Sequence, residues 1–307
     1  MNTWNCAQRL LCRVLLTLMA AVGVLAQAQT QAQTQPQTQP QTQPQTQPQT
    51  QARFVLGPVS RDGQGLGHQL ASYPVDGLQQ FALLLWPAGN RPAAGWPVVL
   101  FAHGFHPEPR NYGRLASGET SRPGDYYRGL VTAYARAGFL VVAPDYRGHN
   151  DSEGAEYTRR PLAARWYARD YAAALDGVEG LEGIDRARVF AVGHSMGGSV
   201  IAHAASALAG RVRAVSLWST AAVSRALTAG DGGPGGFAAL DAPLLLHHGV
   251  ADPVTPFANA QDLVLARHEQ GTPYALYRYD TDAHLLEGED LRKALELDFE
   301  AFSTSGH

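Results

Sequence analysis

A glycine-rich turn centred on Ser195 constrains the fold of this chain more than any other feature. It follows the apolar run 189–192 and precedes a run of small residues with helical periodicity over 199–208. Gly193 and Gly197 complete the pattern Gly-x-Ser-x-Gly, which requires a strand, a tight turn and a helix. Glycine suits both positions because a Cβ would clash where strand and helix close together. The pattern predicts a nucleophilic serine whose hydroxyl projects above the sheet. An incidental serine in an ordinary turn is the alternative, and the Gly-x-Gly-x-x-Gly spacing of a dinucleotide loop is absent.

The surrounding elements predict an α/β domain that begins near Phe54. An antiparallel pair is expected over 68–75 and 78–86, and further strands over 96–102, 139–143, 189–192, 212–218, 243–247 and 274–279. Helices are expected over 126–137, 161–178, 196–208, 256–270 and 289–302. Continuous apolar runs are typical of parallel strands covered on both faces. Their alternation with helices predicts right-handed crossovers and a mostly parallel central sheet with helices on both faces.

Candidate catalytic side chains follow the predicted strands. Ser195, Asp252 and His284 occur in that order, 57 and 32 residues apart. In open parallel sheets ligands bind at the carboxyl ends of the strands, where all three would lie. A neutral imidazole can remove the serine proton during attack, and a carboxylate orients the imidazole and stabilises its cation. Asp280 and Asp282 could replace Asp252, but they stand too near His284 in sequence to reach its ring easily.

Other histidines compete for the catalytic role, because the chain has 11. His194 is next to Ser195, so its side chain is expected to point away from the serine hydroxyl. His103, His247 and His248 end strands, where burial and hydrogen bonding would explain them. The histidine clusters His247-His248 and His103-x-x-His106 also lack the metal-binding pattern of two histidines four residues apart on a helix with a glutamate. We therefore predict no metal ligand and no cofactor.

A second turn, His103-Gly104-Phe105, follows the strand expected over 96–102. The backbone N–H groups of Phe105 and Met196 are predicted to form an oxyanion hole, which stabilises the anion that forms when an acyl carbonyl is attacked. Tyr112 is a possible additional donor. A simple strand-ending turn is the alternative interpretation.

Taken together, these motifs resemble those of the α/β-hydrolase family over about residues 70–302. The residues that carry the resemblance are His103-Gly104, Asp145-Tyr146-Arg147-Gly148-His149, Gly193-His194-Ser195-Met196-Gly197, His248-Gly249-x-x-Asp252 and His284. The Asp145-Tyr-Arg-Gly and Asp252-Pro-Val-x-Pro256 segments look closest to the catalytic domains of prolyl oligopeptidases and to related secreted esterases. The resemblance implies a nucleophile at Ser195, an acid at Asp252 and a base at His284. It also implies that Asp145 and Arg147 brace a loop. The large N-terminal propeller of prolyl oligopeptidases is absent here.

The function predicted is that of a serine hydrolase, a carboxylesterase working through an acyl-enzyme. A peptidase acting on short peptides is the alternative with the same chemistry, and a catalytically inactive binding module is the alternative from another class. A minimal cap is expected, because the interval 219–242 contains a glycine-rich stretch and offers only Leu227 and Phe237 as obvious apolar candidates for holding an acyl chain. Short acyl groups are therefore expected to be preferred to long ones.

The amino end predicts export. A polar start with Arg9 and Arg13 leads into 13 apolar residues, 14–26, and small residues suit cleavage after residue 28. That run is too short for a bilayer span, which needs about 20 residues. Residues 1–28 are thus predicted to be a signal peptide, 29–52 a disordered linker rich in Gln, Thr and Pro, and 53–307 the catalytic domain. A secreted or periplasmic protein without stable membrane insertion is expected.

The net charge and the cysteine content limit the classes of binding partner and of catalytic nucleophile that can be expected. The formal net charge is −3, or about −5 after loss of the two leader arginines, with no basic cluster. Nucleic-acid binding therefore has no electrostatic support. Both cysteines, Cys6 and Cys12, lie in the leader, so the mature chain would have neither a disulfide nor a thiol nucleophile. A small ester or short peptide is the expected substrate.

Overall fold

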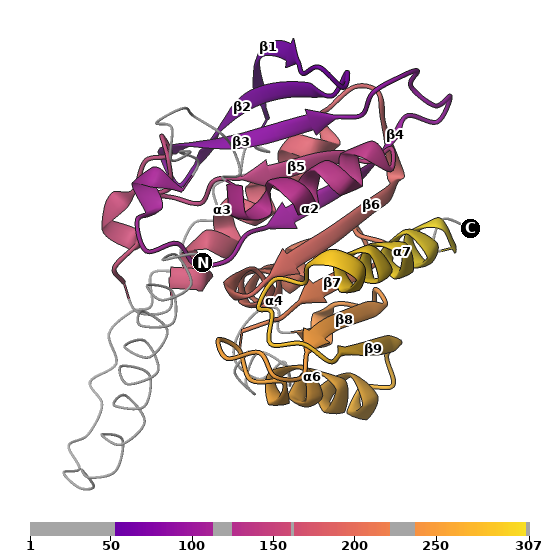
Figure 1. The fold of residues 1–307 in the computed structure, drawn as a ribbon. Coiled ribbons are helices and arrows are strands. Elements are labelled where there is room, and N and C mark those ends of the chain that lie inside the picture. The colour runs from indigo at the N-terminus through magenta and orange to yellow at the C-terminus, as the bar shows by residue number, and fades with distance from the viewer. Residues whose placement is uncertain (1–52, 113–124, 161–162, 222–236, 305–307) are drawn as a thin grey trace, which may run out of the picture. The chain divides into compact units, whose positions relative to one another are not determined.

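The computed structural model describes residues 53–112, 125–160, 163–221 and 237–304. All of these residues belong to one compact unit, which extends from Gln51 to His307. Its centre is a nine-stranded sheet in the order β1-β2-β3-β5-β4-β6-β7-β8-β9 (Figure 1). The predicted signal peptide, linker and most of the predicted cap interval lie outside the described residues. Within the described residues, no helix has the length and apolarity needed to span a bilayer.

The sheet is antiparallel at one edge and parallel over the rest. The strands β1–β3 and β5 pair antiparallel, whereas β5, β4, β6, β7, β8 and β9 pair parallel in that spatial order. Strand bounds are β1 Val55–Arg61, β2 Gly67–Val75, β3 Leu78–Trp86, β4 Trp96–Ala102, β5 Leu140–Pro144, β6 Ile184–His194, β7 Val215–Trp218, β8 Leu244–Gly249 and β9 Tyr274–Tyr279. The mostly parallel sheet predicted from the sequence is confirmed.

Two helical layers cover the sheet. The helices are α2 Asp125–Arg136, α3 Ala163–Glu179, α4 Met196–Leu208, α6 Ala258–Glu269 and α7 Gly288–Thr304, with short 3-10 turns at Pro109–Asn111, Ala155–Tyr157 and Phe237–Ala239. Residues of α3, α4 and α6 share one apolar core with the sheet, and residues of α2 and α7 share the other. Along β4 the side chains alternate between these cores, Val98 and Leu100 entering the first and Val99 and Phe101 the second. Both faces of the central strands are therefore buried, which explains their continuous apolarity.

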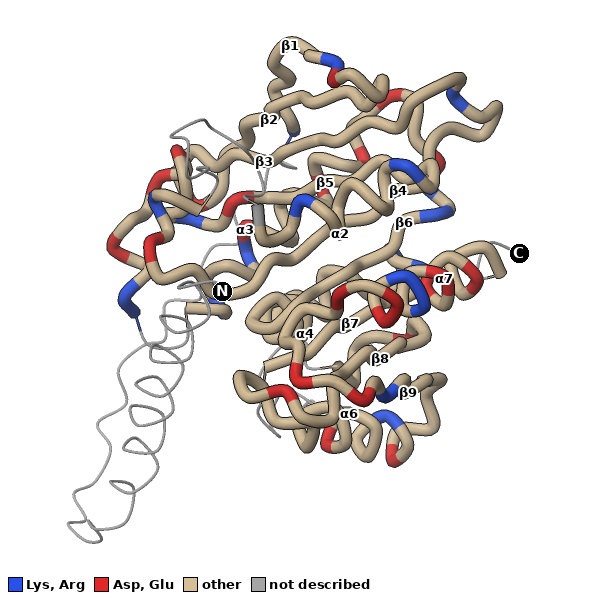
Figure 2. Tube along the Cα trace, viewed as in Figure 1, with Lys and Arg blue, Asp and Glu red and all other residues tan. Residues whose placement is uncertain are grey.

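Charged residues are placed mainly outside the buried central strands. Figure 2 shows Lys, Arg, Asp and Glu mainly on helices and connecting loops. The strands β4, β5, β7 and β8 contain none of these four residue types. Their backbone groups are paired within the sheet, so an ionised side chain there would be buried without compensation.

The main differences from the sequence prediction lie at the ends of elements. β1 was not predicted, because it contains Gly57 and Pro58, has a bulge between Leu56 and Val59, and is largely exposed. β6 begins at Ile184, five residues before the predicted start, because its first half is polar and only half-buried. Phe237, one of the two apolar side chains that the sequence offers for holding an acyl chain, is fully buried in the core beneath α4. The other, Leu227, lies outside the described residues.

Candidate active site

Ser195 forms the turn between β6 and α4, as the motif predicts. Its φ is +55° and its ψ is −121°, a backbone conformation rare for a residue with a side chain. Three hydrogen bonds hold this conformation: Ser195 N donates to Trp218 O, and Ser195 O accepts from Gly198 N and Ala221 N, each at 3.0 Å. The surrounding backbone therefore holds the strained turn that presents the serine at the carboxyl end of the sheet.

The glycines around Ser195 allow the close approach of three backbones. A Cβ on Gly197 would lie 2.0 Å from the carbonyl oxygen of Ala102, at the end of β4. One on Gly193 would lie 2.7 Å from a methyl of Ile201, and one on Gly198 would lie 2.0 Å from Thr220 Oγ1. The steric role predicted for glycines 193 and 197 is thus confirmed.

Asp252 and His284 meet in the structure. The Nδ1 atom of His284 lies 2.8 Å from Asp252 Oδ2, and the carboxylate is buried. Because a carboxylate accepts, Nδ1 carries the proton, and the Nε2 lone pair is available as a base. The centroid of the His284 ring is 4.6 Å from that of His194, which puts it beside the Ser195 turn. Among the described residues, no hydrogen bond joins Ser195 Oγ to His284.

The environment of Asp252 favours its ionised form. Burial alone would raise its pKa, but the hydrogen bond and charge of His284 and the hydrogen bonds from the next turn together lower it. Its Oδ1 accepts from Val254 N at 2.7 Å and Thr255 N at 3.1 Å, and Thr255 Oγ1 lies 2.8 Å from Oδ2. Sequence reasoning missed Thr255, although its spacing three residues after an aspartate is typical of a local side-chain turn.

The two predicted oxyanion donors belong to segments next to Ser195. A Cβ built on Gly104 would be 3.1 Å from Ser195 Cβ, so the turn after β4 packs directly against the serine. Met196 is the first residue of α4. Within the described parts of the chain, the backbone N–H groups of Phe105 and Met196 have no hydrogen-bond partner. The Tyr112 hydroxyl is buried and also has no partner there.

The competing residues occupy other positions. His103 is stacked between Tyr112 and Tyr146, each 4.0 Å away, and burial holds its pKa well below the ordinary value. His247 pairs with Asp298 at 3.0 Å in the core. His248 contacts the carbonyl of Thr255 at 2.9 Å behind Asp252. Asp280 and Asp282 are exposed.

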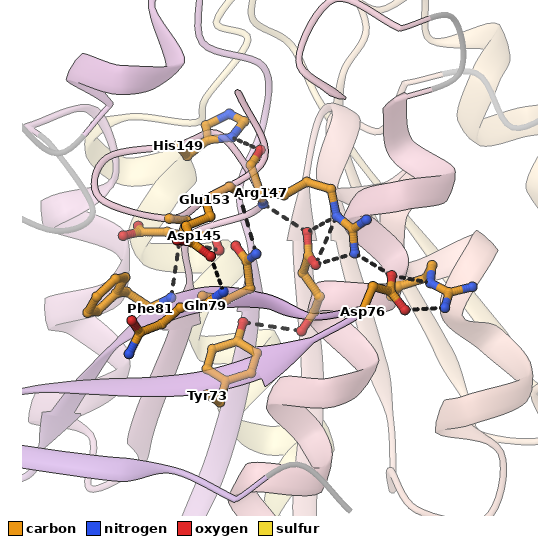
Figure 3. Close-up of polar contacts among 12 residues, drawn as sticks. Tyr73, Asp76, Gln79, Phe81, Asp145, Arg147, His149 and Glu153 are labelled. Atoms are coloured by element: carbon orange, nitrogen blue, oxygen red, sulfur yellow. Dashed lines mark hydrogen bonds and ion pairs between the residues drawn. The ribbon is translucent and has the colours of Figure 1, made fainter. Parts of the chain in front are cut away.

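The loop after β5 is braced by buried charges, as the resemblance implied. Arg147 donates to Asp170 through Nε at 3.0 Å and Nη2 at 2.7 Å, and to Asp76 at 2.9 Å (Figure 3). Asp145 accepts from Asn150 Nδ2 at 2.8 Å. Asp145, Arg147 and Asp170 are almost fully buried. Their side chains are engaged in holding this loop against β2, β3 and α3.

Comparison with known proteins agrees with this architecture. The α/β hydrolase fold family matches residues 97–283, which is more than half of the chain. The chain belongs to the α/β-hydrolase fold family. The matched segment contains Ser195 and Asp252 and ends one residue before His284. No curated protein sequence matches the chain.

Solved α/β hydrolases with a similar fold include peptidases and esterases, as the resemblance implied. Dipeptidyl peptidase 4 from Porphyromonas gingivalis has 17% identity and a TM-score of 0.59, with 78% of this chain and 35% of that one covered. Acylaminoacyl peptidase from Pyrococcus horikoshii has 18% identity and a TM-score of 0.57, with coverage of 78% and 41%. Acetyl xylan esterase from Paenibacillus sp. R4 has 18% identity and a TM-score of 0.59, with coverage of 81% and 88%. This chain thus spans little more than a third of the first of these structures.

Proposed function

We propose that this chain is a serine hydrolase that cleaves carboxylic esters through an acyl-enzyme. The observation that carries the proposal is the Asp252–His284 pair, 2.8 Å apart, beside a serine held at positive φ between strand and helix. Strained backbone at a serine is costly and is typical of sites where the side chain must be presented in one direction. The order Ser, Asp, His along the chain is also that expected for this fold.

In the proposed first step, Ser195 Oγ attacks the acyl carbon while His284 Nε2 accepts its proton. Asp252 keeps the imidazole in the tautomer protonated at Nδ1 and stabilises the cation that forms. Attack requires the serine hydroxyl to turn toward Nε2, because the two groups are not hydrogen-bonded in the structure. The carbonyl oxygen becomes an anion.

The N–H groups of Phe105 and Met196 are proposed to receive that anion. Both lack partners within the described residues, and the second belongs to the first turn of α4, where the helix dipole favours negative charge. Collapse of the intermediate breaks the ester C–O bond, and His284 returns its proton to the departing alcohol. Water, deprotonated by His284, then releases the acid and restores Ser195.

We further propose that short acyl groups are preferred. The burial of Phe237 removes one of the two side chains expected to hold a long chain. Among the described residues, the exposed large apolar side chains in the segments that follow β4 and β8 are Phe105, Val250 and Val254. Each fully buried apolar side chain would contribute about 1.5–3 kcal/mol to holding a substrate, so these few offer little for sixteen carbons.

The rival proposal with the same residues is a peptidase, which the similarity to dipeptidyl and acylaminoacyl peptidases favours. The similarity to an acetyl xylan esterase of similar TM-score favours the esterase in the same way. The catalytically inactive binding module remains the alternative from another class, although it gives no reason for a serine at positive φ beside a hydrogen-bonded Asp252–His284 pair.

Two measurements test these proposals. A fluorophosphonate probe should label the wild type and not the Ser195→Ala variant, whereas an inactive module would not label at all. Then kcat/KM is measured on p-nitrophenyl esters of two to sixteen carbons and on aminoacyl anilides. Fastest cleavage of short esters supports the esterase. Fastest cleavage of anilides would favour the peptidase, and a maximum at long chains would contradict the short-acyl preference.

Export to a secreted or periplasmic location also remains a proposal, as does the division at residues 28 and 52. It rests on the sequence of residues 1–52, which lie outside the described part of the chain. Amino-terminal sequencing of the mature protein should give a start at Gln27 or Gln29. An intact Met1 on the exported protein would contradict the proposal.

A further inference from the structure

His194, beside the proposed nucleophile, joins two parts of the site that are far apart in sequence. Its Nε2 lies 2.9 Å from the backbone carbonyl oxygen of His284, and its Nδ1 lies 2.8 Å from the hydroxyl of Tyr127. That hydroxyl in turn accepts a hydrogen bond of 2.8 Å from the backbone N–H of Gly104. The contacts connect the turn after β4, the start of α2, the end of β6 and the loop after β9.

The donor and the acceptor of each of these three hydrogen bonds can be assigned. A carbonyl oxygen only accepts, so His194 Nε2 must carry a proton and donate it to His284 O. Burial, together with the charge of His284, lowers the pKa of His194 to about 3, so its ring is neutral and Nδ1 is an acceptor. Tyr127 therefore donates to Nδ1 and accepts from Gly104. With a neutral His194 ring, no other arrangement of protons satisfies all three contacts.

The three hydrogen-bonded residues Gly104, Tyr127 and His194 have little freedom to rearrange. Tyr127 and His194 are 4% and 1% exposed, and their rings meet edge to face with centroids 5.4 Å apart. Burial raises the pKa of Tyr127 well above its usual value, which keeps the hydroxyl protonated as a donor. Gly104 has no space for a side chain, since a Cβ would lie 2.5 Å from the Tyr127 hydroxyl. Loss of either side chain would leave buried polar groups unpaired.

We propose that His194 and Tyr127 are positioning residues: they hold the backbone of His284 and the turn at Gly104–Phe105 in register with Ser195. This inference rests on the proposed serine hydrolase function. The base His284 and the proposed oxyanion donor Phe105 lie on loops, whereas Ser195 and Met196 lie at the β6–α4 junction. His194 is next to Ser195 and hydrogen-bonds the backbone of His284, so it fixes the loop of the base relative to that junction. Catalysis is sensitive to such placement, because a displacement of 1 Å costs about a hundredfold in rate.

Two substitutions of His194 separate its hydrogen bond to His284 from its packing. Gln places an amide nitrogen near the position of Nε2 and can still donate to His284 O, whereas Asn reaches only the position of Nδ1. We expect His194→Asn to lower kcat about tenfold or more with little change in KM, and His194→Gln to recover most of that loss. Tyr127→Phe, which removes the middle of the chain, should behave like His194→Asn. His203→Asn, a half-buried histidine of α4 away from the site, is the matched control.

A spectroscopic measurement makes the result independent of turnover. The proton on His284 Nδ1, shared with Asp252, should give a downfield resonance that broadens in His194→Asn and Tyr127→Phe but not in His194→Gln or His203→Asn. Equal kcat and equal spectra for the Asn and Gln variants would overturn the inference. So would a change confined to KM.

Failure of the proposed function has a different outcome. In that case the wild type would not react with the fluorophosphonate at all, and the His284 resonance alone would decide whether His194 positions the loop. Should His194→Asn fail to fold, Tyr127→Phe and its spectrum decide the question in its place.

Discussion

Substitution of Gly197 by alanine tests the packing on which the proposed site depends. The added methyl would lie 2.0 Å from Ala102 O, 2.7 Å from Ala102 C and 3.0 Å from His103 O. All three are backbone atoms of β4 or of the turn that follows it, so no side chain can rotate away. The helix and the strand must separate by about 1 Å. Overpacking of this kind costs about 1–3 kcal/mol, or roughly 3–10 °C in Tm for a domain of this size.

The substitution should also impair catalysis. A 1 Å shift at the start of α4 moves Ser195 and the N–H of Met196 relative to Phe105, which is expected to lower kcat/KM about a hundredfold. The matched control is Gly129→Ala, in the exposed middle of α2, where a Cβ meets nothing within 4 Å. Alanine there should stabilise the protein by about 0.5–1 kcal/mol and leave activity unchanged. Thermal unfolding and ester hydrolysis measure both. A Gly197→Ala enzyme with wild-type rate and Tm would refute the reasoning.

Three further predictions concern stability and the amino end. Burial lowers the pKa of His149 to about 4. Its imidazole is therefore protonated below about pH 6.5 in the unfolded chain but only below about pH 4 in the folded one. The free energy of unfolding should therefore decrease as the pH falls from about 6.5 to about 4, and His149→Phe should make that decrease smaller. Urea unfolding at several pH values measures the effect. An unchanged slope of the unfolding free energy against pH would contradict this prediction. Asp298→Ala should lower the unfolding free energy by about 3 kcal/mol or more, because His247, Trp218 and Tyr134 each donate to that buried carboxylate. Deletion of residues 29–51 should leave kcat/KM unchanged, and loss of activity in a folded deletion variant would mean that the repeat contributes to the site.

The site was predictable where its residues are tied to local motifs. Ser195 was found because strand, glycine turn and helix are consecutive in sequence, so the geometry follows from the chain itself. Asp252 and His284 were found because each stands just after a predicted strand, and parallel strands bring their carboxyl ends to one edge. The structure brings these two side chains together at 2.8 Å, and it separates Asp280 and Asp282 from them.

The contacts of Tyr127, His194 and Thr255 were not predictable in the same way. Tyr127 belongs to an amphipathic helix whose apolar face explains it equally well as core. His194 was expected only to point away from the serine hydroxyl, and nothing in the sequence indicates which backbone its ring would reach. The position of Phe237 was undecided for a related reason: a large apolar side chain in a loop can face a substrate or the core, and the loop sequence does not distinguish the two.

Local chain chemistry by itself determined the α/β architecture, the strand–turn–helix around Ser195 and the order of the three candidate catalytic residues. These features depend on periodicity, glycine placement and short-range spacing, which act between neighbouring residues. Only the tertiary structure decided that Asp252 is the carboxylate that meets His284 and that Phe237 is buried. It also decided that His194 spans from Tyr127 to the backbone of His284. Those outcomes depend on how separate βα units pack against one another, and this packing is set by the shape of the whole core.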